Sequence, residues 1–262
     1  MSLIALITDF STRDWYVAEM KGAILGVDRN ATIVDITHHT APGDVRNAAF
    51  ILAACMDSFP VATVFCAVAD PGVGSVRRAI VARSDKYFFV GPDNGILSFA
   101  LGRSAGVSVR TLDNVRFFRK APLSATFHGR DIFAPAAAHL GAGLSFGSAG
   151  QPVDDYVRID FPQPLVVGPS ITAEVMAIDS FGNVVTSIAS SQINHINAAT
   201  ADLVLPGGRH NIKRGDYYHC VAPGEPIIYG GSCGYIEIGI NGGDAAKRFG
   251  VSVRERIELV FS

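Results

Sequence analysis

The chain has 262 residues, of which 48% are hydrophobic and 18% charged, and its formal net charge is −2. This composition is typical of a globular protein with a sizeable core. It excludes a disordered chain and a broad basic surface for nucleic acid. The N-terminal stretch MSLIALITDF has no basic segment, and no run approaches the roughly 20 apolar residues of a membrane helix. We therefore expect a cytoplasmic protein that binds neither nucleic acid nor membrane.

The first half of the chain alternates predicted strands with predicted helices. Short apolar and β-branched runs predict strands at 3–8, 32–36, 61–68, 79–82, 87–90 and 107–112. Apolar residues at helical spacing predict helices at 14–27, 44–56 and 130–140, and Asp44 is the expected N-cap of the second. The β-α-β-α-β order predicts an α/β domain with a partly parallel sheet covered by helices.

Glycine and proline become frequent between residues 141 and 170, which indicates a domain boundary. Short apolar segments separated by turns then follow at 171–179, 183–187, 202–205, 226–229, 234–240 and 256–261. This pattern predicts an all-β domain, either a small barrel or a sandwich. We therefore predict an α/β domain at 1–158, a linker at 159–167 and an all-β domain at 168–262.

The cysteines and histidines show no metal-binding pattern. The adjacent pair His38-His39 is poorly arranged to share one metal ion, and no HExxH motif is present. No CxxC pair or zinc spacing occurs among the four cysteines, which we expect to be free thiols: Cys55, Cys66, Cys220 and Cys233.

Acidic residues follow several apolar strands. Asp9 comes after LIALIT, Asp70 after VFCAVA and Asp179 after ITAEVMAI. In open α/β sheets, ligands bind beyond the carboxyl ends of the strands, and Asp9 and Asp70 fit that position. The alternative is that each acid only caps a turn or a helix.

The stretch D-P-G-V-G-S-V-R-R at 70–78 has two interpretations. Glycines let backbone amides approach a phosphate, but the stretch lacks the lysine of a phosphate loop and precedes a predicted strand rather than a helix. A turn that places Asp70 against Arg77 or Arg78 is the better interpretation. In such a pair the guanidinium keeps the carboxylate ionised and fixes its orientation.

Three further segments contain groups suited to catalysis or binding. His128 in T-F-H-G-R-D directly precedes the predicted helix at 130–140, where it serves either proton transfer or helix capping. In the second half, D-S-F-G-N at 179–183 combines an acid, an aromatic ring and an amide, and the glycine-rich G-G-S-C-G-Y-I-E-I-G-I-N-G-G-D follows at 230–244. An aromatic ring beside an amide suits a nucleobase, although each segment alone is also a common turn.

Seven motifs occur in a characteristic order: T-D-F-S-T-R-D, D-I-T-H-H, D-P-G-V-G-S-V-R-R, G-P-D-N-G, T-F-H-G-R-D-I-F-A-P, D-S-F-G-N and G-S-C-G-Y-I-E-I. With these motifs the chain resembles the S-adenosyl-L-methionine (SAM) hydroxide adenosyltransferases, the adenosine-forming SAM hydrolases. That family is related to the bacterial fluorinase and chlorinase. The resemblance extends over nearly the whole chain.

The resemblance implies a fold, an assembly and a reaction. The fold is an α/β N-terminal domain with a C-terminal β-barrel domain, and the assembly is a homotrimer with each active site between the N-domain of one subunit and the C-domain of the next. A water-derived nucleophile attacks C5′ of the SAM ribose and gives adenosine and L-methionine, without metal or cofactor. Asp70, Arg77 and His128 match the set that holds and activates the water. The doubled arginine leaves Arg78 as an alternative to Arg77, and His128 acts either as a base or by orienting the water.

Six more positions match residues with which the family binds its substrate. Asp9 corresponds to the acid on the ribose hydroxyls, and Asp14 to a nearby acid in the same loop. Asp179 and Ser232 correspond to groups that hold the methionine amine and carboxylate. The last two correspond to residues that contact the adenine, namely Phe181 and Asn183.

Two positions favour a hydrolase over a halide-using transferase. The related halogenases have tyrosine-proline where this chain has Asp70-Pro71, and tyrosine-serine where it has His128-Gly129. A carboxylate at position 70 repels a halide, whereas an aspartate and a histidine can orient water.

Two other positions depart from the fluorinase pattern. Gly43 stands where the fluorinase has a tryptophan beside the ribose, and Cys233 stands where it has an arginine. These differences concern substrate contacts rather than the reaction. The alternatives to SAM hydrolysis are a chlorinase-like halide adenosyltransferase and a non-catalytic protein that binds SAM or adenosine.

Overall fold

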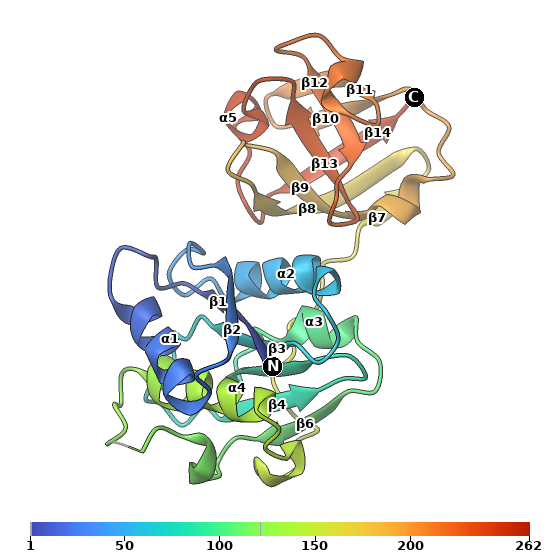
Figure 1. The fold of residues 1–262 in the computed structure, drawn as a ribbon. Helices are drawn as coiled ribbons and strands as arrows, with labels where there is room; N and C mark the ends of the chain where they lie inside the picture. Colours follow the sequence, from blue (N-terminus) through green and yellow to red (C-terminus); the bar gives the residue numbers. More distant parts are fainter. Residues whose placement is uncertain (1, 121) are drawn as a thin grey trace. The chain divides into compact units, whose positions relative to one another are not determined.

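The computed structural model describes residues 2–120 and 122–262, and the chain divides into two compact units, one ending at Asp160 and the other running from Phe161 to Ser262 (Figure 1). The division falls inside the segment 159–167, which the sequence predicts as a linker. Part of this segment nevertheless forms strand β7 (Leu165–Val167), because Gly168, with φ of 58°, turns the chain back onto β8 (Ser170–Ile178). No helix in the described part of the chain combines the length and apolar character that a membrane span requires.

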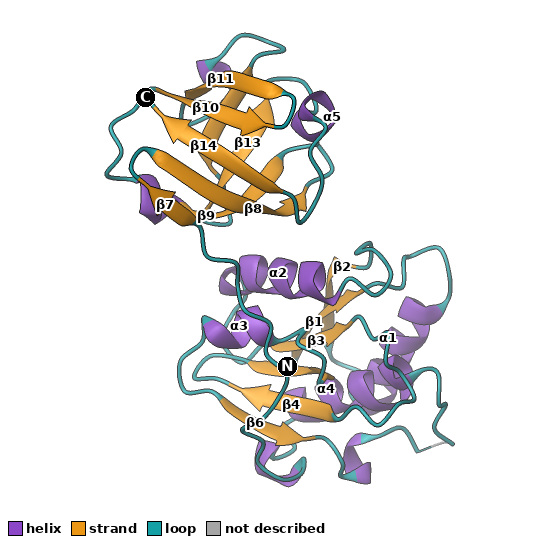
Figure 2. Ribbon diagram, turned by 180° about the vertical axis from the view of Figure 1, so that it is seen from behind, coloured by secondary structure: helices purple, strands orange, loops and turns teal. Residues whose placement is uncertain are grey.

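The N-terminal unit is built on a mixed six-stranded sheet in the order β2-β1-β3-β5-β4-β6 (Figure 2). Four strands pair in parallel: β1 (Leu3–Thr8), β2 (Thr32–Thr37), β3 (Val64–Val68) and β5 (Phe88–Pro92). Strand β4 (Ala79–Arg83) is antiparallel to β5 and to β6 (Ser108–Thr111). Helices connect β1, β2 and β3, whereas a short turn joins β4 to β5 and permits only antiparallel pairing. The predicted α/β domain with a partly parallel sheet is confirmed.

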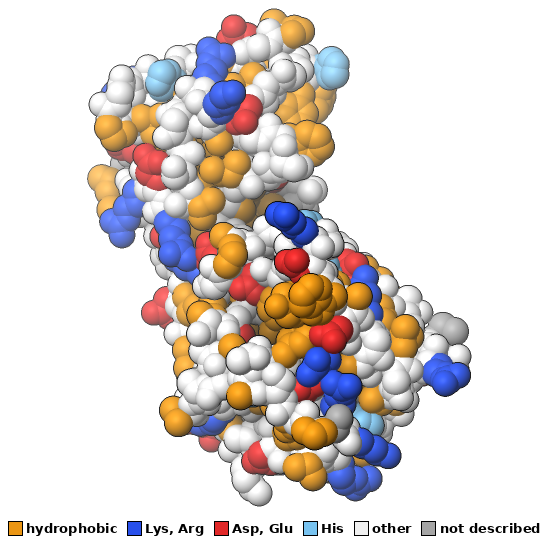
Figure 3. All heavy atoms as spheres, turned by 90° about the vertical axis from the view of Figure 1, so that its left-hand side faces the viewer, with side chains coloured by type: hydrophobic (Ala, Val, Ile, Leu, Met, Phe, Trp, Pro, Cys, Tyr) orange, Lys and Arg blue, Asp and Glu red, His pale blue; other side chains and the backbone are white. Residues whose placement is uncertain are grey.

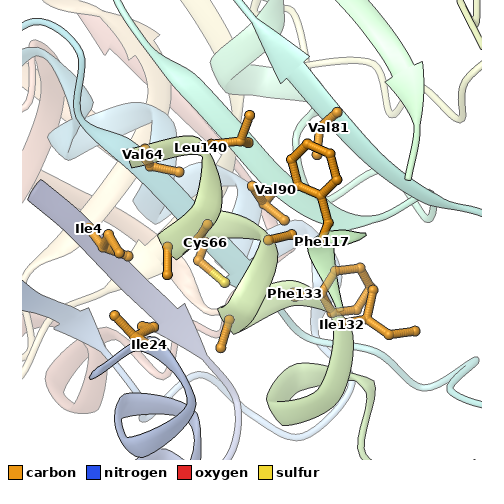
Figure 4. Close-up of a cluster of buried hydrophobic side chains, with 14 of the residues drawn as sticks. Ile4, Ile24, Val64, Cys66, Val81, Val90, Phe117, Ile132, Phe133 and Leu140 are labelled. Carbon is orange, nitrogen blue, oxygen red and sulfur yellow. The ribbon is translucent and has the colours of Figure 1, made fainter. Parts of the chain in front are cut away.

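Helices cover both faces of this sheet. Helix α1 (Tyr16–Val27) packs with α4 (Ala134–Gly141) on one face, and α2 (Val45–Cys55) packs with α3 (Ser98–Gly102) on the other (Figure 1). Figure 4 shows the core on the α4 side, where strand residues such as Ile4 and Cys66 belong to the same buried cluster as Phe133. Burial raises the pKa of the Cys66 thiol to about 12, so Cys66 is an inert core residue.

Local structure differs from the sequence pattern at two places in this unit. The strand predicted at 61–68 begins at Val64, because Ala62 has φ of 65° and Val61 is 71% exposed in a turn. The helix predicted at 130–140 begins with a π-helical turn, Gly129–Phe133. Pro135 has no N–H to donate to the carbonyl of Asp131, which accepts instead from the Arg119 N–H over 2.9 Å.

The C-terminal unit is a closed barrel. In the described residues seven strands form the ring, which closes because β14 (Arg256–Phe261) pairs with both β10 (Thr200–Leu205) and β8. The other members are β9 (Val184–Ala189), β11 (Gly208–Arg214), β12 (Pro226–Gly230) and β13 (Tyr235–Ile240). Inward-facing isoleucines and valines fill the interior. The closure decides between the two predicted all-β folds, since a sandwich would leave the edges of its sheets open.

The sequence pattern did not reveal β11 or the short helices α3 and α5 (Ala245–Phe249). In β11 only Ile212 is buried, so no alternation of apolar and polar residues marks the strand. The two helices have five residues each, which is too short to show a helical period.

Candidate active site

Asp70 lies at the carboxyl end of the sheet, two residues beyond β3. Strand β1 pairs with β2 on one edge and with β3 on the other, so the strand order reverses at this point. Ligands of open α/β sheets bind at such a reversal, outside the carboxyl ends of the strands. Asp9 directly follows β1, so both acids lie where the sequence predicts them.

Arg77 binds the Asp70 carboxylate with a bidentate pair of hydrogen bonds. Its Nε donates to Oδ1 over 2.9 Å, and its Nη2 donates to Oδ2. Only 4% of the Asp70 side chain and 11% of the Arg77 side chain are exposed. The guanidinium also lies over the ring of Phe133, 5.2 Å from its centroid. The pair is therefore shielded from water and held in one geometry.

His128 completes this cluster. Its Nδ1 lies 2.8 Å from Nη2 of Arg77. Because a guanidinium can only donate, Nδ1 accepts this hydrogen bond, and the neutral ring carries its proton on Nε2. Burial lowers the pKa of His128 below its ordinary value of 6.5, and the charge of Arg77 lowers it further. The imidazole is therefore neutral at pH 7.

Arg78 points to a different set of acids. Its guanidinium binds Asp93 and Asp155, each over 2.7 Å, and Asp93 also accepts the N–H of Val157 over 2.7 Å. The structure thus brings Arg77, and not Arg78, to Asp70 and His128. Arg78 instead fastens the segment around residue 155 to the sheet.

Two acids inside the sequence motifs anchor chain segments next to the cluster, although the sequence assigned them no role. Asp93 holds Arg78, and the neighbouring Asn94 donates from Nδ2 to the carbonyl of Ala69, 2.8 Å away, next to Asp70. Asp131 is fully buried just after His128. Burial opposes its ionisation, but hydrogen bonds from Arg130, from the backbone N–H of Ser124 and from Arg119 outweigh burial and lower its pKa. The signal in the sequence was an acid within each motif. Apart from Arg130, which is next to Asp131 in the chain, these partners lie 7 to 15 residues away, and spacing alone does not identify them.

The two candidate acids of the N-terminal loop differ in their surroundings. Asp9 Oδ2 accepts the N–H of Gly43 over 2.7 Å, and a Cβ added at Gly43 would lie 3.7 Å from the Cβ of Pro71. Asp9 is therefore held close to the segment that carries Asp70. Asp14 is exposed in the loop before α1, and no described residue binds its side chain.

Aromatic rings gather around Phe127, the residue before His128, and Figure 3 shows a hydrophobic patch on the face of this unit that carries α1. The Phe127 ring lies 5.9 Å from that of Phe10 and 5.2 Å from that of Tyr16. Tyr16 in turn contacts Trp15, which is 65% exposed. These rings form a connected aromatic cluster that begins at the residue next to His128 in the chain.

We expect Gly74→Ala to destabilise the turn between Asp70 and Arg77. Gly74 has φ of 79°, and an added Cβ would lie 2.5 Å from the carbonyl oxygen of Ala125, just upstream of His128. The expected loss is about 2 kcal/mol in the free energy of unfolding, measured by denaturant titration. Gly143→Ala is the control, because Gly143 has φ of 93° but open space around it. Equal losses in the two variants would contradict the role of this contact.

The residues that match adenine and methionine contacts in the C-terminal unit lie in two turns. In the β8–β9 turn, Asp179 Oδ1 accepts the N–H groups of Phe181 and Asn183, each over 2.9 Å, and Oδ2 accepts from Asn183 Nδ2 over 2.7 Å. Asn183 is buried, whereas Phe181 is 75% exposed. Asp179 thus fixes the direction of the amide and leaves the phenyl ring open to a ligand.

Ser232 is exposed in the turn between β12 and β13, above a hydrogen-bonded set that the sequence did not predict. Glu237 Oε2 accepts from the hydroxyl of Tyr229 over 2.7 Å, and that hydroxyl lies 2.6 Å from the hydroxyl of Tyr218. Glu237 also fills the space under Gly231, where an added Cβ would lie 1.9 Å from Oε1. The Glu237 side chain therefore supports the turn that carries Ser232.

Among the described residues, no group of three or more His, Cys, Asp or Glu side chains could hold a metal ion. The cysteines in this part of the chain are all free. What the two units offer chemically is a buried carboxylate–guanidinium–imidazole cluster on an α/β domain, together with polar turns on a β-barrel.

A two-domain protein with this fold and cluster has known relatives. The sequence models of the SAM hydroxide adenosyltransferase N-terminal and C-terminal domains match residues 4–150 and 173–258. The chain therefore belongs to the SAM hydroxide adenosyltransferase family. It is 37% identical to the (R)-S-adenosyl-L-methionine hydrolase of Salinispora tropica, over 98% of this chain and 97% of the relative. A fluorinase from an Actinoplanes species is 26% identical over 91% of each chain.

A solved structure has the same fold. The crystal structure of an uncharacterized conserved protein from Thermotoga maritima superposes with a TM-score of 0.94 at 34% identity, and the match covers 98% of this chain and 99% of that one. The expected family and the expected pairing of an α/β domain with a β-barrel domain are confirmed.

Proposed function

We propose that the chain hydrolyses SAM to adenosine and L-methionine, and that Asp70, Arg77 and His128 form its water site. The observation that carries this proposal is the buried cluster in which one guanidinium binds both the carboxylate and the imidazole. Membership of the SAM hydroxide adenosyltransferase family supports it, as does the hydrolase name of the relative from Salinispora tropica.

The chemistry asks little of the protein beyond positioning. The oxygen of a water molecule attacks C5′, the C5′–S bond breaks, and its electron pair returns to sulfur to give the neutral thioether of methionine. A sulfonium is already a good leaving group, so orientation and exclusion of bulk water supply much of the rate. Because Nε2 of neutral His128 already carries a proton, His128 orients the water, and the carboxylate of Asp70 accepts the water's proton.

The arrangement of Arg77 argues against a halide in this site. A guanidinium has five N–H donors. Those on Nε and Nη2 bind Asp70 and His128, and Nη1 lies 3.4 Å from the carbonyl oxygen of Arg78. Few donors therefore remain for an anion, and the charge of Asp70 repels one.

The proposal also assigns the substrate contacts and the assembly. Asp9 and Asp14 serve the ribose side, Asp179 and Ser232 the methionine end, and the adenine packs on Phe181 and bonds to Asn183. The working form is a homotrimer in the cytoplasm, where its free thiols stay reduced. Light scattering tests the assembly, because a trimer has three times the 27.7 kDa of one chain.

Incubation with SAM in ¹⁸O-labelled water tests the reaction. We expect adenosine and L-methionine in equal amounts, with the label at the 5′ oxygen of adenosine because water attacks C5′. The same incubation with added chloride or fluoride tests the halide alternative, which predicts 5′-halo-adenosine. Tight SAM binding in calorimetry without release of methionine would instead establish a non-catalytic binding protein.

We expect Tyr229→Phe to raise KM for SAM several-fold while kcat changes less. Removal of the hydroxyl leaves Glu237 without its 2.7 Å donor and loosens the turn that carries Ser232, a proposed contact of the methionine end. An unmade hydrogen bond of this kind costs about 1–3 kcal/mol. Steady-state kinetics measure the effect, with Tyr217→Phe as the control because Tyr217 is 63% exposed. An unchanged KM in Tyr229→Phe would remove Glu237 and Tyr229 from substrate binding.

A further inference from the structure

Three arginines line a cavity of about 740 Å³ at the edge strand β6 of the N-terminal unit. Arg83 is the last residue of β4, Arg110 lies in β6, and Arg158 follows the segment that bridges to β6 at Pro152. Asp154 is the one acid among the described residues that line this cavity. The lining therefore carries three positive charges against one negative charge. We call it the arginine cavity.

Aromatic rings and two backbone carbonyls, those of Gly150 and Asp154, hold these guanidinium groups in place. Arg83 and Arg110 both lie over the ring of Phe146, 5.3 and 5.7 Å from its centroid. Arg158 lies 4.4 Å from the centroid of Tyr156. Arg110 also donates from Nη1 to the carbonyl of Gly150 over 2.8 Å. Two positive charges at one ring repel each other, so an anion bound to either guanidinium would lower this repulsion.

These three arginines differ from others in the same unit. Arg103 pairs with Asp57, and Arg119 and Arg130 pair with Asp131, just as Arg77 and Arg78 pair with their own acids. In the described part of the chain, no carboxylate forms an ion pair with any arginine of the cavity. The three guanidinium groups thus keep N–H donors with which they can bind a ligand. The positive charge of this cavity is local, because the whole chain has a net charge of −2.

We propose that the arginine cavity binds a small phosphate-bearing anion with two or more negative charges. Guanidinium groups recognise phosphate through paired N–H donors, and an oligophosphate can reach several arginines at once. The volume lies within the range of small-molecule sites and exceeds what a single phosphate fills. The site is separate from that of cationic SAM, since it shares no residue with the Asp70, Arg77 and His128 cluster.

Calorimetric titration of the full chain with inorganic pyrophosphate tests this site. We expect saturable binding of one pyrophosphate per chain and an affinity that falls as sodium chloride is added. The double variant Arg83→Gln/Arg158→Gln should bind about tenfold more weakly or worse. Both arginines are exposed, so the fold should tolerate the change, and an unaltered melting temperature without ligand checks this. Arg29→Gln is the matched control, an exposed arginine of the same unit outside the cavity.

Absence of saturable pyrophosphate binding, or equal affinity in the double variant and the wild type, would overturn the proposal. Loss of affinity in Arg29→Gln to the same extent as in the double variant would also overturn it. Saturation with SAM separates this site from the proposed active site. We expect pyrophosphate to bind equally well with and without SAM, and competition between the two would place the anion in the active site instead. None of these results depends on whether SAM is hydrolysed.

Discussion

Asp70→Asn is expected to lower kcat for SAM hydrolysis by about 10³-fold while leaving KM close to that of the wild type. The amide keeps the size of the side chain, but it cannot accept the proton of the attacking water. It also leaves the charge of Arg77 uncompensated in a place where 11% of that side chain is exposed. Release of methionine under saturating SAM measures kcat, and calorimetry with SAM measures binding separately.

Asp93→Asn provides a matched control for this variant. Asp93 is also a buried acid bound by an arginine, with 3% of its side chain exposed against 4% for Asp70, and the two acids follow the neighbouring parallel strands β5 and β3. Breaking the buried Asp70–Arg77 pair should cost about 3 kcal/mol in the free energy of unfolding, by analogy with other buried pairs. Breaking the Asp93–Arg78 pair should cost less, because 36% of the Arg78 side chain is exposed and solvent screens the pair. A loss of kcat in Asp70→Asn alone would assign the effect to chemistry. Similar kcat values in the two variants would make Asp70 a structural acid.

The sequence predicts the fold well where one face of an element is buried and the other is not. Strands β1 and β14 match their predicted ranges, and Asp44 caps α2 by accepting the N–H of Asn47 over 3.1 Å. Propensity failed at Val61, a β-branched residue in a turn, because the left-handed backbone of Ala62 is set by the tertiary structure. Strand β11 was missed because the barrel uses its backbone while most of its side chains stay in water.

In the candidate site too, the features set by neighbouring residues were predictable, whereas the contacts between distant segments were not. The turn between Asp70 and the two arginines is local information, and the expectation that this turn places Asp70 against one of them agrees with the Asp70–Arg77 pair. The choice between Arg77 and Arg78 is not local, because Phe133 and Asp93, on which the two guanidiniums rest, come from other elements. Likewise, the proton position on His128 follows from a contact with a residue 51 positions away. Sequence spacing alone holds no information on such a contact.

His128→Gln is expected to retain activity within about tenfold of the wild type, whereas His128→Ala should lose about 10³-fold. A glutamine can accept from Arg77 with its carbonyl and donate to water with its amide, which are the two roles of the neutral imidazole protonated on Nε2. A glutamine cannot act as a base. Equal losses in the two variants would therefore show that His128 removes a proton from the water.

The pH dependence of kcat is a second test of the role of neutral His128 in orienting the water. Burial and the neighbouring Arg77 lower the pKa of His128, so the folded protein keeps the ring neutral below pH 6.5 while the unfolded chain takes up a proton there. Wild-type activity should therefore persist at pH 6.5 and fall only as the pH drops through this lowered value. Stability should also decline below pH 6.5, because protons bind the unfolded state more strongly. In His128→Gln this acid limb should disappear. If the acid limb persisted in His128→Gln, it would belong to the titration of another group. The rate would then not depend on the neutral form of His128.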